Sequence, residues 1–333
     1  HYQTRFIFGA IYVKKRACPH CKTNNVKRDG FTMLRKQRFR CRQCHKRFIW
    51  KRLDVKKRNG FSWFQLWIHE SDSVRRLSGL SGHSAFKIKQ IKNDWLSQTP
   101  ETTSDFSKIK YALYDGTYFG RSNCFMVLMN AQDQSIAAHV HTSKEGYHYV
   151  LPWLYQLRSQ GLNPLYIAMD GEISVMRAIR EVWPGIKIQR CLYHIQREGL
   201  RWLRTFPKTQ AGCELRAILS TLASIKSFKD RDVFIQLFHS WINAHYTFIK
   251  TLPSSSIQFR DLKKTVTLIK NAMPDMFLYL DDPNIPSTTN ALEGFFSRLK
   301  SDYQRHRGLS KQHRISYLNW YCHLKNNAAS TIF

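Results

Sequence analysis

Acidic residues are scarce in this chain. Among its 333 residues, 23 Asp and Glu stand against 53 Lys and Arg, which gives a formal net charge of +30 at pH 7. This imbalance points to a polyanionic partner, and nucleic acid fits it better than a membrane surface. The charge is also uneven, because residues 1–58 hold 19 Lys or Arg against only Asp29 and Asp54. We therefore expect a basic, DNA-contacting arm at the amino-terminal end.

Long apolar runs are missing as well. No stretch of about 18 uncharged apolar residues occurs, so the sequence predicts no transmembrane helix. We also find no secretory signal pattern. The chain begins with His1 rather than Met, which is compatible with a native start further upstream. A chain of this length can bury a sizeable core, in one large domain or in a few modules.

Of the eight cysteines, four form two Cys-x-x-Cys pairs and four are scattered. We therefore expect metal binding and free thiols in a reducing compartment, not a disulfide scaffold. The pairs are Cys18/Cys21 in CPHC and Cys41/Cys44 in CRQC, separated by 19 residues. Four thiolates at this spacing complete a tetrahedral zinc site and leave no open position for catalysis.

The segment between the Cys pairs carries an Asp-Gly turn between β-compatible stretches, which is typical of a zinc ribbon. One interpretation is that the metal only holds a small fold together. The other adds DNA contact by basic side chains on that fold, and the two are compatible. The side chains expected to contact DNA here are Lys22, Lys27, Arg28, Arg35, Lys36, Arg38, Arg40 and Arg42.

The next segment is predicted to be helical. It contains a short apolar helix, a turn around residues 80–84, and a basic helix with Ile88, Ile91 and Leu96 on its buried side. This pattern is typical of a helix-turn-helix, whose second helix enters the major groove of DNA. An ordinary helical hairpin linking two domains is the alternative. The candidate DNA contacts on the second helix are Lys87, Lys89, Gln90, Lys92 and Asn93.

Three carboxylates stand in strongly patterned contexts further along the chain. They are Asp115 in YALYDGTYF, Asp170 in YIAMDGEIS and Glu293 in TTNALEGFFSRLK. The aspartates lie at or just past the ends of apolar, strand-like runs, and the glutamate lies in an amphipathic, helix-like run. Two strand-end aspartates and a helical glutamate can hold two divalent cations about 4 Å apart, an arrangement that drives in-line attack on a phosphodiester. Hard oxygen ligands favour Mg²⁺ or Mn²⁺.

Each carboxylate also has a structural interpretation. An Asp before Gly commonly opens a turn. A Glu in the first turn of a helix is favoured by the helix dipole and is usually solvated. In the helix pattern around Glu293, the preceding Ser-Thr-Thr-Asn supplies capping side chains. Glu293 and Lys300 lie together beside the apolar stripe. We expect basic side chains near this helix to meet phosphates, namely Arg298, Lys300, Arg305 and Arg307.

A CLYH motif, from Cys191 to His194, lies between the second and third carboxylates. It is similar to half of a zinc site, but no second pair follows at zinc spacing. One helical turn separates the two side chains, so both could face an active site, where His194 would orient water, phosphate or Asp170. The alternative is a packed cysteine and a hydrogen-bonded histidine. Glu172, beside Asp170, remains unassigned.

The order of the predicted elements indicates an α/β fold class. From residue 109 the pattern is three strands, helix, strand, helix, short strand and helix. This is the order of the ribonuclease-H-like fold, in which the first and fourth strands are neighbours, so Asp115 and Asp170 would converge. From about 204 to 285 helix patterns dominate, which predicts an all-α insertion before the helix of Glu293.

Taken together, these motifs resemble the DDE transposases of the Mutator-like group, the insertion sequence 256 family. DGT, MDG, C-x-x-H and TTN-x-x-E-G-F match that family in order over roughly residues 105–325, and the ribbon resembles its zinc-binding variant. The resemblance implies DNA strand cleavage and strand transfer by Asp115, Asp170 and Glu293 with two Mg²⁺ or Mn²⁺ ions. Cys191, His194 and Lys300 would support them. The insertion is implied as well.

The sequence patterns and the resemblance together predict the domains and partners. We expect a zinc-ribbon arm at 1–58, a helix-turn-helix-like module and linker at 59–104, and a catalytic core at 105–333. The expected partners are double-stranded transposon ends, target DNA and further copies of the chain, in a bacterial cytoplasm and without a membrane. The rival hypothesis is a non-catalytic DNA-binding regulator derived from a transposase.

Overall fold

The computed structural model describes residues 17–33, 35–49, 53–69, 72–101, 105–306 and 308–329. The chain divides into two compact units, with the boundary between Trp63 and Phe64. Helix α1 (Leu53–His69) crosses that boundary. The predicted mixture of helices and sheets is confirmed. In the described part of the chain, every helix is too short or too polar to cross a membrane.

The first unit contains a small antiparallel sheet in the order β1-β2-β3. Its strands are β1 (Val26–Phe31), β2 (Gln37–Cys41) and β3 (Arg47–Ile49). Phe39 is opposite Phe48 in the sheet, and their rings stack with centroids 6.1 Å apart. On the other face Asp29 forms ion pairs with Arg38 and Arg47. These contacts, together with the cysteines described below, help to hold the described part of this unit together.

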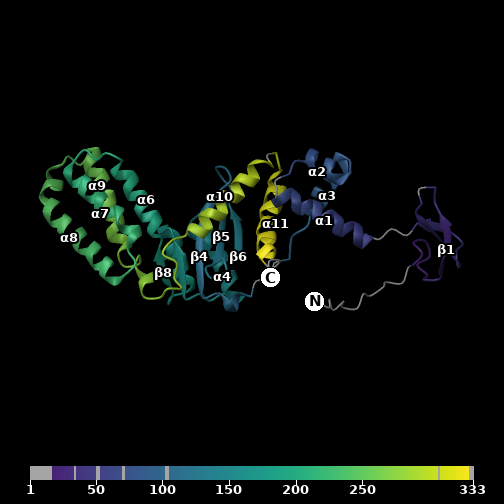
Figure 1. Ribbon diagram of the computed structural model, residues 1–333. Coiled ribbons are helices and arrows are strands. Elements are labelled where there is room, and N and C mark those ends of the chain that lie inside the picture. Colours follow the sequence, from purple (N-terminus) through teal and green to yellow (C-terminus); the bar gives the residue numbers. More distant parts are fainter. Residues whose placement is uncertain are drawn as a thin grey trace, which may run out of the picture. The chain divides into compact units, whose positions relative to one another are not determined.

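The second unit is built on a five-stranded sheet in the order β6-β5-β4-β7-β8. The first three strands in sequence pair antiparallel, and β4-β7 and β7-β8 pair in parallel. Figure 1 shows these strands side by side in the middle of this unit. β4 and β7, which are the first and fourth of these strands along the chain, are neighbours, as the sequence predicted. The strands are β4 (Tyr111–Tyr118), β5 (Cys124–Asn130), β6 (Ile136–Thr142), β7 (Tyr166–Met169) and β8 (Lys187–Arg190).

Helices α4 (Tyr147–Ser159) and α5 (Ile173–Val182) make the crossovers that parallel strands require. Their apolar faces form a core with the sheet, in which Val150 and Ile179 are fully buried. Helix α4 ends because Gly161 adopts a φ of 97°, a conformation that glycine tolerates at little cost. These crossovers fix the loop after β7, and therefore the position of Asp170.

A helical segment follows β8. Its helices are α6 (Leu192–Leu203), α7 (Gln210–Ser220), α8 (Phe228–Thr251) and α9 (Ile257–Ala272). Residues 204–285, all of which the structure describes, contain helices and no strand. The segment has a core of its own, in which Leu215, Phe238 and Ile269 are buried. Short 3-10 turns occur at Phe106–Lys108, Leu222–Ser224 and Leu278–Leu280.

Four further helices complete the second unit. They are α2 (Val74–Ser81), α3 (Ala85–Leu96), α10 (Asn290–Gln304) and α11 (Lys311–Ala329). The turn between α2 and α3 begins later than predicted, because α2 continues to Ser81 and Gly82 ends it with a φ of 66°. The Trp320 indole on α11 donates hydrogen bonds to the carbonyls of Trp95 and Gln98. The helix pair α2–α3 is therefore tied to α11, which packs against β6.

Gly199 in α6 lies at a close approach to Leu219 of α7. A Cβ atom there would lie 2.3 Å from Leu219 Cδ2, which is fully buried and cannot move freely. Gly79 in α2 is also a helix glycine, but a Cβ there meets nothing within 4 Å. We predict that Gly199→Ala lowers the free energy of unfolding by about 1–2 kcal/mol, because overpacking outweighs the better helix propensity of alanine.

The matched control is Gly79→Ala, which should raise the free energy of unfolding by up to about 1 kcal/mol. Urea unfolding followed by circular dichroism would measure both. Equal effects of the two substitutions would contradict the packing argument.

Candidate active site and cysteine cluster

Asp115 lies within strand β4, not at its end as predicted. The strand continues because its pairing with β5 extends to Tyr118 opposite Cys124. The parallel pairing with β7 stops earlier, at Leu113 opposite Ala168. Asp115 therefore lies beyond the last residue that β7 covers. Asp170 directly follows β7, so both aspartates lie beyond the same end of the β4–β7 pairing.

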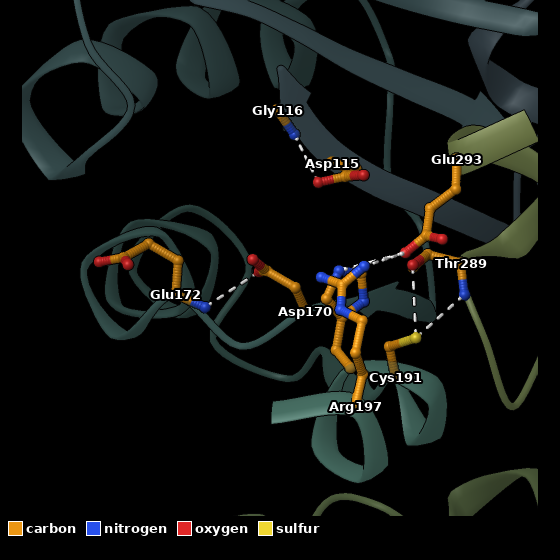
Figure 2. Close-up of polar contacts among 9 residues, drawn as sticks. Asp115, Gly116, Asp170, Glu172, Cys191, Arg197, Thr289 and Glu293 are labelled. Atoms are coloured by element: carbon orange, nitrogen blue, oxygen red, sulfur yellow. Dashed lines mark hydrogen bonds and ion pairs between the residues drawn. The ribbon is translucent and has the colours of Figure 1, made fainter. Parts of the chain in front are cut away.

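Glu293 lies in the first turn of α10, as predicted. The three carboxylates line one cleft of about 680 Å³, together with His194, Lys300 and other residues. Figure 2 shows Asp115, Asp170 and Glu293 reaching this space from a strand, a loop and a helix. Tertiary structure thus brings together the three acids that the sequence singled out.

Asp115 is a buried carboxyl beside a second carboxyl, that of Asp170. Its burial, reinforced by the negative charge of Asp170, raises the pKa of the Asp115 carboxyl to about 7, although His194 acts in the opposite direction. One carboxylate oxygen, Oδ1, accepts a hydrogen bond of 2.8 Å from the N–H of Gly116. A nearby positive charge would relieve this crowding.

Glu293 is held by two basic side chains from α6. Its Oε1 lies 3.2 Å from His194 Nε2 and 3.8 Å from Arg197 NH1. The same oxygen is buried and accepts no hydrogen bond from the described residues. A buried carboxylate oxygen in this state has room for a further electropositive partner. Glu293 therefore faces the cleft and is not a solvated surface residue.

The predicted capping of α10 by its preceding hydroxyl and amide side chains is not found. Thr289 occupies the N-cap position without a side-chain capping bond. Its N–H and hydroxyl instead donate to Cys191 Sγ, over 3.3 and 3.4 Å. These bonds anchor the start of α10 to the start of α6, so the TTN motif positions Glu293 by a different route from the one predicted.

The two residues of the CLYH pair have different positions. Cys191 is the N-cap residue of α6, is fully buried and does not line the cleft, whereas His194 does. Burial alone would raise the pKa of the Cys191 thiol, but hydrogen bonds with His194 and Thr289 lower it. Burial would lower the pKa of His194, but Cys191 and Glu293 together raise it. Cys191 thus lies outside the cleft and positions neighbouring residues, whereas His194 lines the cleft.

The sequence pattern did not reveal why a glycine follows each of the two aspartates; in the structure, neighbouring side chains occupy the space that a Cβ would need. A Cβ at Gly171 would lie 1.9 Å from Arg190 Nε, and a Cβ at Gly116 would lie 2.7 Å from Glu145 Oε2. Gly171 also adopts a φ of 102°. Gly116 lies inside a strand, so its role is close approach and not a turn.

Arg190 and Glu145 are site residues that the sequence analysis missed. The Arg190 side chain is buried, and its Nε donates to the carbonyl of Asp170 over 3.3 Å. Glu145 accepts a hydrogen bond of 2.9 Å from the Tyr114 hydroxyl, and burial raises the pKa of its carboxyl to about 7. Arg190 directly precedes the CLYH motif, which was the available signal, while Glu145 lies in a loop without any pattern.

Glu172 has a structural role. Its Oε1 accepts hydrogen bonds from the N–H and hydroxyl of Ser174, at the start of α5. In Figure 2 its carboxylate lies on the far side of Asp170 from Glu293. Glu172 therefore acts as a helix cap beside the site.

The carboxylate oxygens of the cleft are of the type that divalent cations prefer, and they are buried or lack hydrogen-bond partners. They do not lie close enough together to form a ligand set. Among the described residues, the four ribbon cysteines are the one group of three or more potential ligands whose atoms all lie within 4.8 Å of one another. The oxygens of Asp115, Asp170 and Glu293 would have to move closer to share a metal ion.

The cysteine cluster, by contrast, is assembled. Cys18 Sγ lies 3.6 Å from Cys44 Sγ, and Cys21 Sγ lies 3.5 Å from Cys41 Sγ. Sulfur atoms around a tetrahedral zinc ion with bonds of about 2.3 Å would be about 3.8 Å apart. The N–H groups of Gln43 and Cys44 donate to Cys41 Sγ, which stabilises thiolate charge. The four cysteines therefore fit a structural zinc ion, as the sequence predicted.

The basic residues predicted to contact DNA differ in exposure. On the ribbon most are exposed, but Arg38 and Arg40 are half-buried, and Arg38 Nε donates to the carbonyl of Asp29. On α3, Lys89 is exposed and Lys87 is half-buried, whereas Lys92 lies 5.5 Å from the Trp67 ring centroid. Lys92 is thus held against an aromatic ring of its own unit.

The basic residues near α10 also separate into two groups. Lys300 lines the cleft, while Arg298 and Arg305 are exposed outside its lining. The prediction for Arg307 falls outside the described residues. The proposed basic arm before residue 17 and the linker residues 102–104 also lie outside them.

Comparison with known proteins gives little further information. No protein-family model matches the chain, and neither does any curated protein. Among solved structures, it is similar to a chain in the cryo-electron microscopy structure of the simian T-cell lymphotropic virus intasome in complex with PP2A regulatory subunit B56 gamma. The identity is 12%, 62% of this chain and 68% of that chain are covered, and the TM-score is 0.21. A likeness at this TM-score supports neither a fold assignment nor a function.

The cysteine cluster leads to a prediction about metal content. The purified protein should contain one zinc ion per chain, and Cys41→Ser should lose it, because three thiolates leave the tetrahedral shell open. Cys213→Ser is the matched control, since Cys213 is exposed and far from the cluster in sequence. The zinc content per chain would be measured by inductively coupled plasma mass spectrometry. Full zinc content in Cys41→Ser would contradict the assignment.

Crowding at Asp115 leads to a prediction about pH. The folded protein holds a proton at Asp115 up to about pH 7, whereas the unfolded chain releases it near pH 4. Stability is therefore lost as the pH rises through this window. In buffer without Mg²⁺ or Mn²⁺, Asp115→Asn should stabilise the fold on the order of 2 kcal/mol at pH 8, and much less at pH 4.

Asp281→Asn is the control for this prediction, because Asp281 is exposed. Urea unfolding at both pH values would provide the comparison. If Asp115→Asn gave the same effect at pH 4 and pH 8, the carboxyl would not be crowded in the folded state.

Proposed function

We propose that this protein is a DDE transposase that cuts and transfers DNA strands with divalent metal ions. The observation that carries the proposal is the meeting of Asp115, Asp170 and Glu293 in one cleft, from strand β4, the loop after the adjacent parallel strand β7, and helix α10. Carboxylates in this arrangement are suited to two-metal phosphodiester chemistry. The net charge of +30 is consistent with a DNA substrate.

The sheet supports a ribonuclease-H-like core within this proposal. Three antiparallel strands are followed by two parallel strands, in the order β6-β5-β4-β7-β8, with helices as crossovers. The helical segment between β8 and α10 then corresponds to the expected insertion. The core in this proposal thus consists of a mixed sheet, an insertion and, after the insertion, helix α10, which supplies the third acid.

Asp115, Asp170 and Glu293 would hold the metal ions. When bound, such ions activate a water or a 3′-hydroxyl and stabilise the leaving oxygen. Strand cleavage and strand transfer would both be direct displacements on phosphorus, so no serine or tyrosine nucleophile is required.

The chain's other residues position these acids and the DNA. His194 and Arg197 hold the Glu293 carboxylate through ion pairs, and Arg190 holds the main chain of Asp170. Lys300 also lines the cleft, so its ammonium group would be available to a phosphate bound there. Removal of a side chain that only positions Glu293 should therefore slow the reaction without abolishing metal binding.

DNA recognition would fall to the zinc ribbon and the α2–α3 pair. Both α2 and α3 are capped by serine side chains and joined by a short turn, which is compatible with a helix-turn-helix. Transposition joins two DNA ends, so the active form would be an oligomer assembled on DNA. The proposed partners are the terminal repeats of its own element and a target duplex, in a bacterial cytoplasm.

Cleavage of the element's own terminus tests the proposal. A labelled fragment would be incubated with Mg²⁺ or Mn²⁺, or without either, and with paired ends supplied. We predict metal-dependent nicking at the terminus that is lost in Asp170→Ala and Asp115→Asn, while both variants still bind the fragment. Asp281→Ala, which removes an exposed carboxylate of the same unit, should cleave normally.

A non-catalytic DNA-binding regulator is the second candidate. The observation that favours it is that the three carboxylates are not drawn into one ligand set. Tight binding without any cut, with every metal and with paired ends, would favour the regulator. Cleavage that persists in Asp170→Ala would contradict the assigned site.

A further inference from the structure

A second, larger groove adjoins the candidate active site. It has a volume of about 1020 Å³ and lies between residues of α5, the end of α6 and α9; we refer to it as the α5–α9 groove. It shares Gly171, Arg190 and Leu268 with the cleft of the three acids. A molecule that leaves the cleft past Arg190 would therefore enter this groove directly.

The groove is strongly basic. Its outer cations are Arg177, Arg180, Arg260, Lys263, Lys264 and Lys270. All six side chains are exposed. The lining includes one acid, Asp275, and its Oδ2 lies 2.9 Å from Arg180 NH2. Positive charge therefore remains in excess along the whole groove.

Helical spacing explains how the cations come to share one groove. On α9, the lining residues Arg260, Lys263, Thr267 and Lys270 follow one another at intervals of three or four residues, so they lie on one face. The opposite face of α9, with Leu262 and Ile269, is buried in the helical core. On α5 the lining residues Ile173, Met176, Arg177 and Arg180 follow the same spacing. The groove thus lies between the outward faces of two amphipathic helices.

Apolar groups lie among these cations. The Trp202 ring is half-buried in the lining, with Lys264 Nζ 5.9 Å from its centroid. Ile173, at the start of α5, is 74% exposed. The backbone of a duplex would use the cations alone and leave these groups in water. Unpaired bases would also cover them, because an aromatic ring between cations is a stacking platform for bases.

We propose that the α5–α9 groove binds an unpaired DNA strand that continues from the scissile phosphodiester, with its phosphates along α9 and a base on Trp202. This inference rests on the proposed function, because the cleft supplies the reason for a strand end there. The occupant is identified by its chemistry, which is a polyanion with exposed aromatic faces. Its path is set by the residues shared with the cleft.

The test measures binding without cleavage. Fluorescence anisotropy of a labelled single-stranded oligonucleotide would be recorded over a range of salt concentrations, without Mg²⁺ or Mn²⁺. The groove variant is Lys263→Ala/Lys264→Ala. The matched control is Lys229→Ala/Lys250→Ala, which removes two exposed lysines from α8 of the same helical segment. This control corrects for single-strand binding by other basic surfaces.

The groove variant should bind more weakly than the control, and its log–log salt slope should be smaller by about 1.4, since each single-strand phosphate contributes about 0.7. Trp202→Ala should weaken binding about tenfold through lost base stacking, with an unchanged slope. Light-induced crosslinking of an iodouracil-containing oligonucleotide to the unaltered protein should give an adduct on the peptide that contains Trp202. This last measurement does not depend on the folding of a variant.

Identical affinities and slopes for the groove and control variants would overturn the proposal. Binding of a labelled duplex would be measured in the same way. If the groove variant lost duplex and single-strand binding equally and Trp202→Ala had no effect, the groove would be assigned to duplex DNA and the proposal would also be overturned. The result does not depend on catalysis. If the protein does not cleave DNA but the groove variant binds single strands more weakly, the transposase proposal fails and the groove proposal stands. If cleavage is normal but the groove variant binds as the control does, only the groove proposal fails.

Discussion

Parallel pairing between β4 and β7 places the first two acids of the candidate site. The register that joins Tyr111 with Tyr166 and Leu113 with Ala168 ends just before Asp115 and Asp170. The two carboxylates then lie beyond the same end of this pairing, and α10 brings Glu293 to the same cleft. A shift of one residue would turn Asp115 to the opposite face of the sheet.

Charge has opposite signs at two neighbouring places in the second unit. In the cleft, burial and the neighbouring charge of Asp170 raise the pKa of Asp115 to about 7, although the chain as a whole has a net charge of +30. The adjoining groove concentrates arginines and lysines. Arg190 lies at the junction, where it holds the carbonyl of Asp170. Such a division is suited to a polyanion that is held by cations while metal ions are held by acids.

Close packing explains why certain residues stand beside the acids. Gly171 leaves room for the Arg190 guanidinium, and Gly116 leaves room for the Glu145 carboxylate. Cys191 accepts two hydrogen bonds from Thr289 and thereby joins the start of α6 to the start of α10. The short motifs around the acids are therefore partly packing requirements of the site and not only signals of its chemistry.

The sequence by itself determined the α/β class, the Cys pairs, the strand and helix order, and which three acids to examine. These are local properties, since alternation, helical spacing and Cys-x-x-Cys pairs depend on neighbours along the chain. Tertiary structure decided that Asp115 lies inside a strand, that Thr289 bonds to Cys191 instead of capping α10, and that Lys92 packs on Trp67. It also revealed Arg190, Glu145 and the α5–α9 groove. These contacts join residues from different elements of the fold, and alternation and helical spacing carry no information on such pairs.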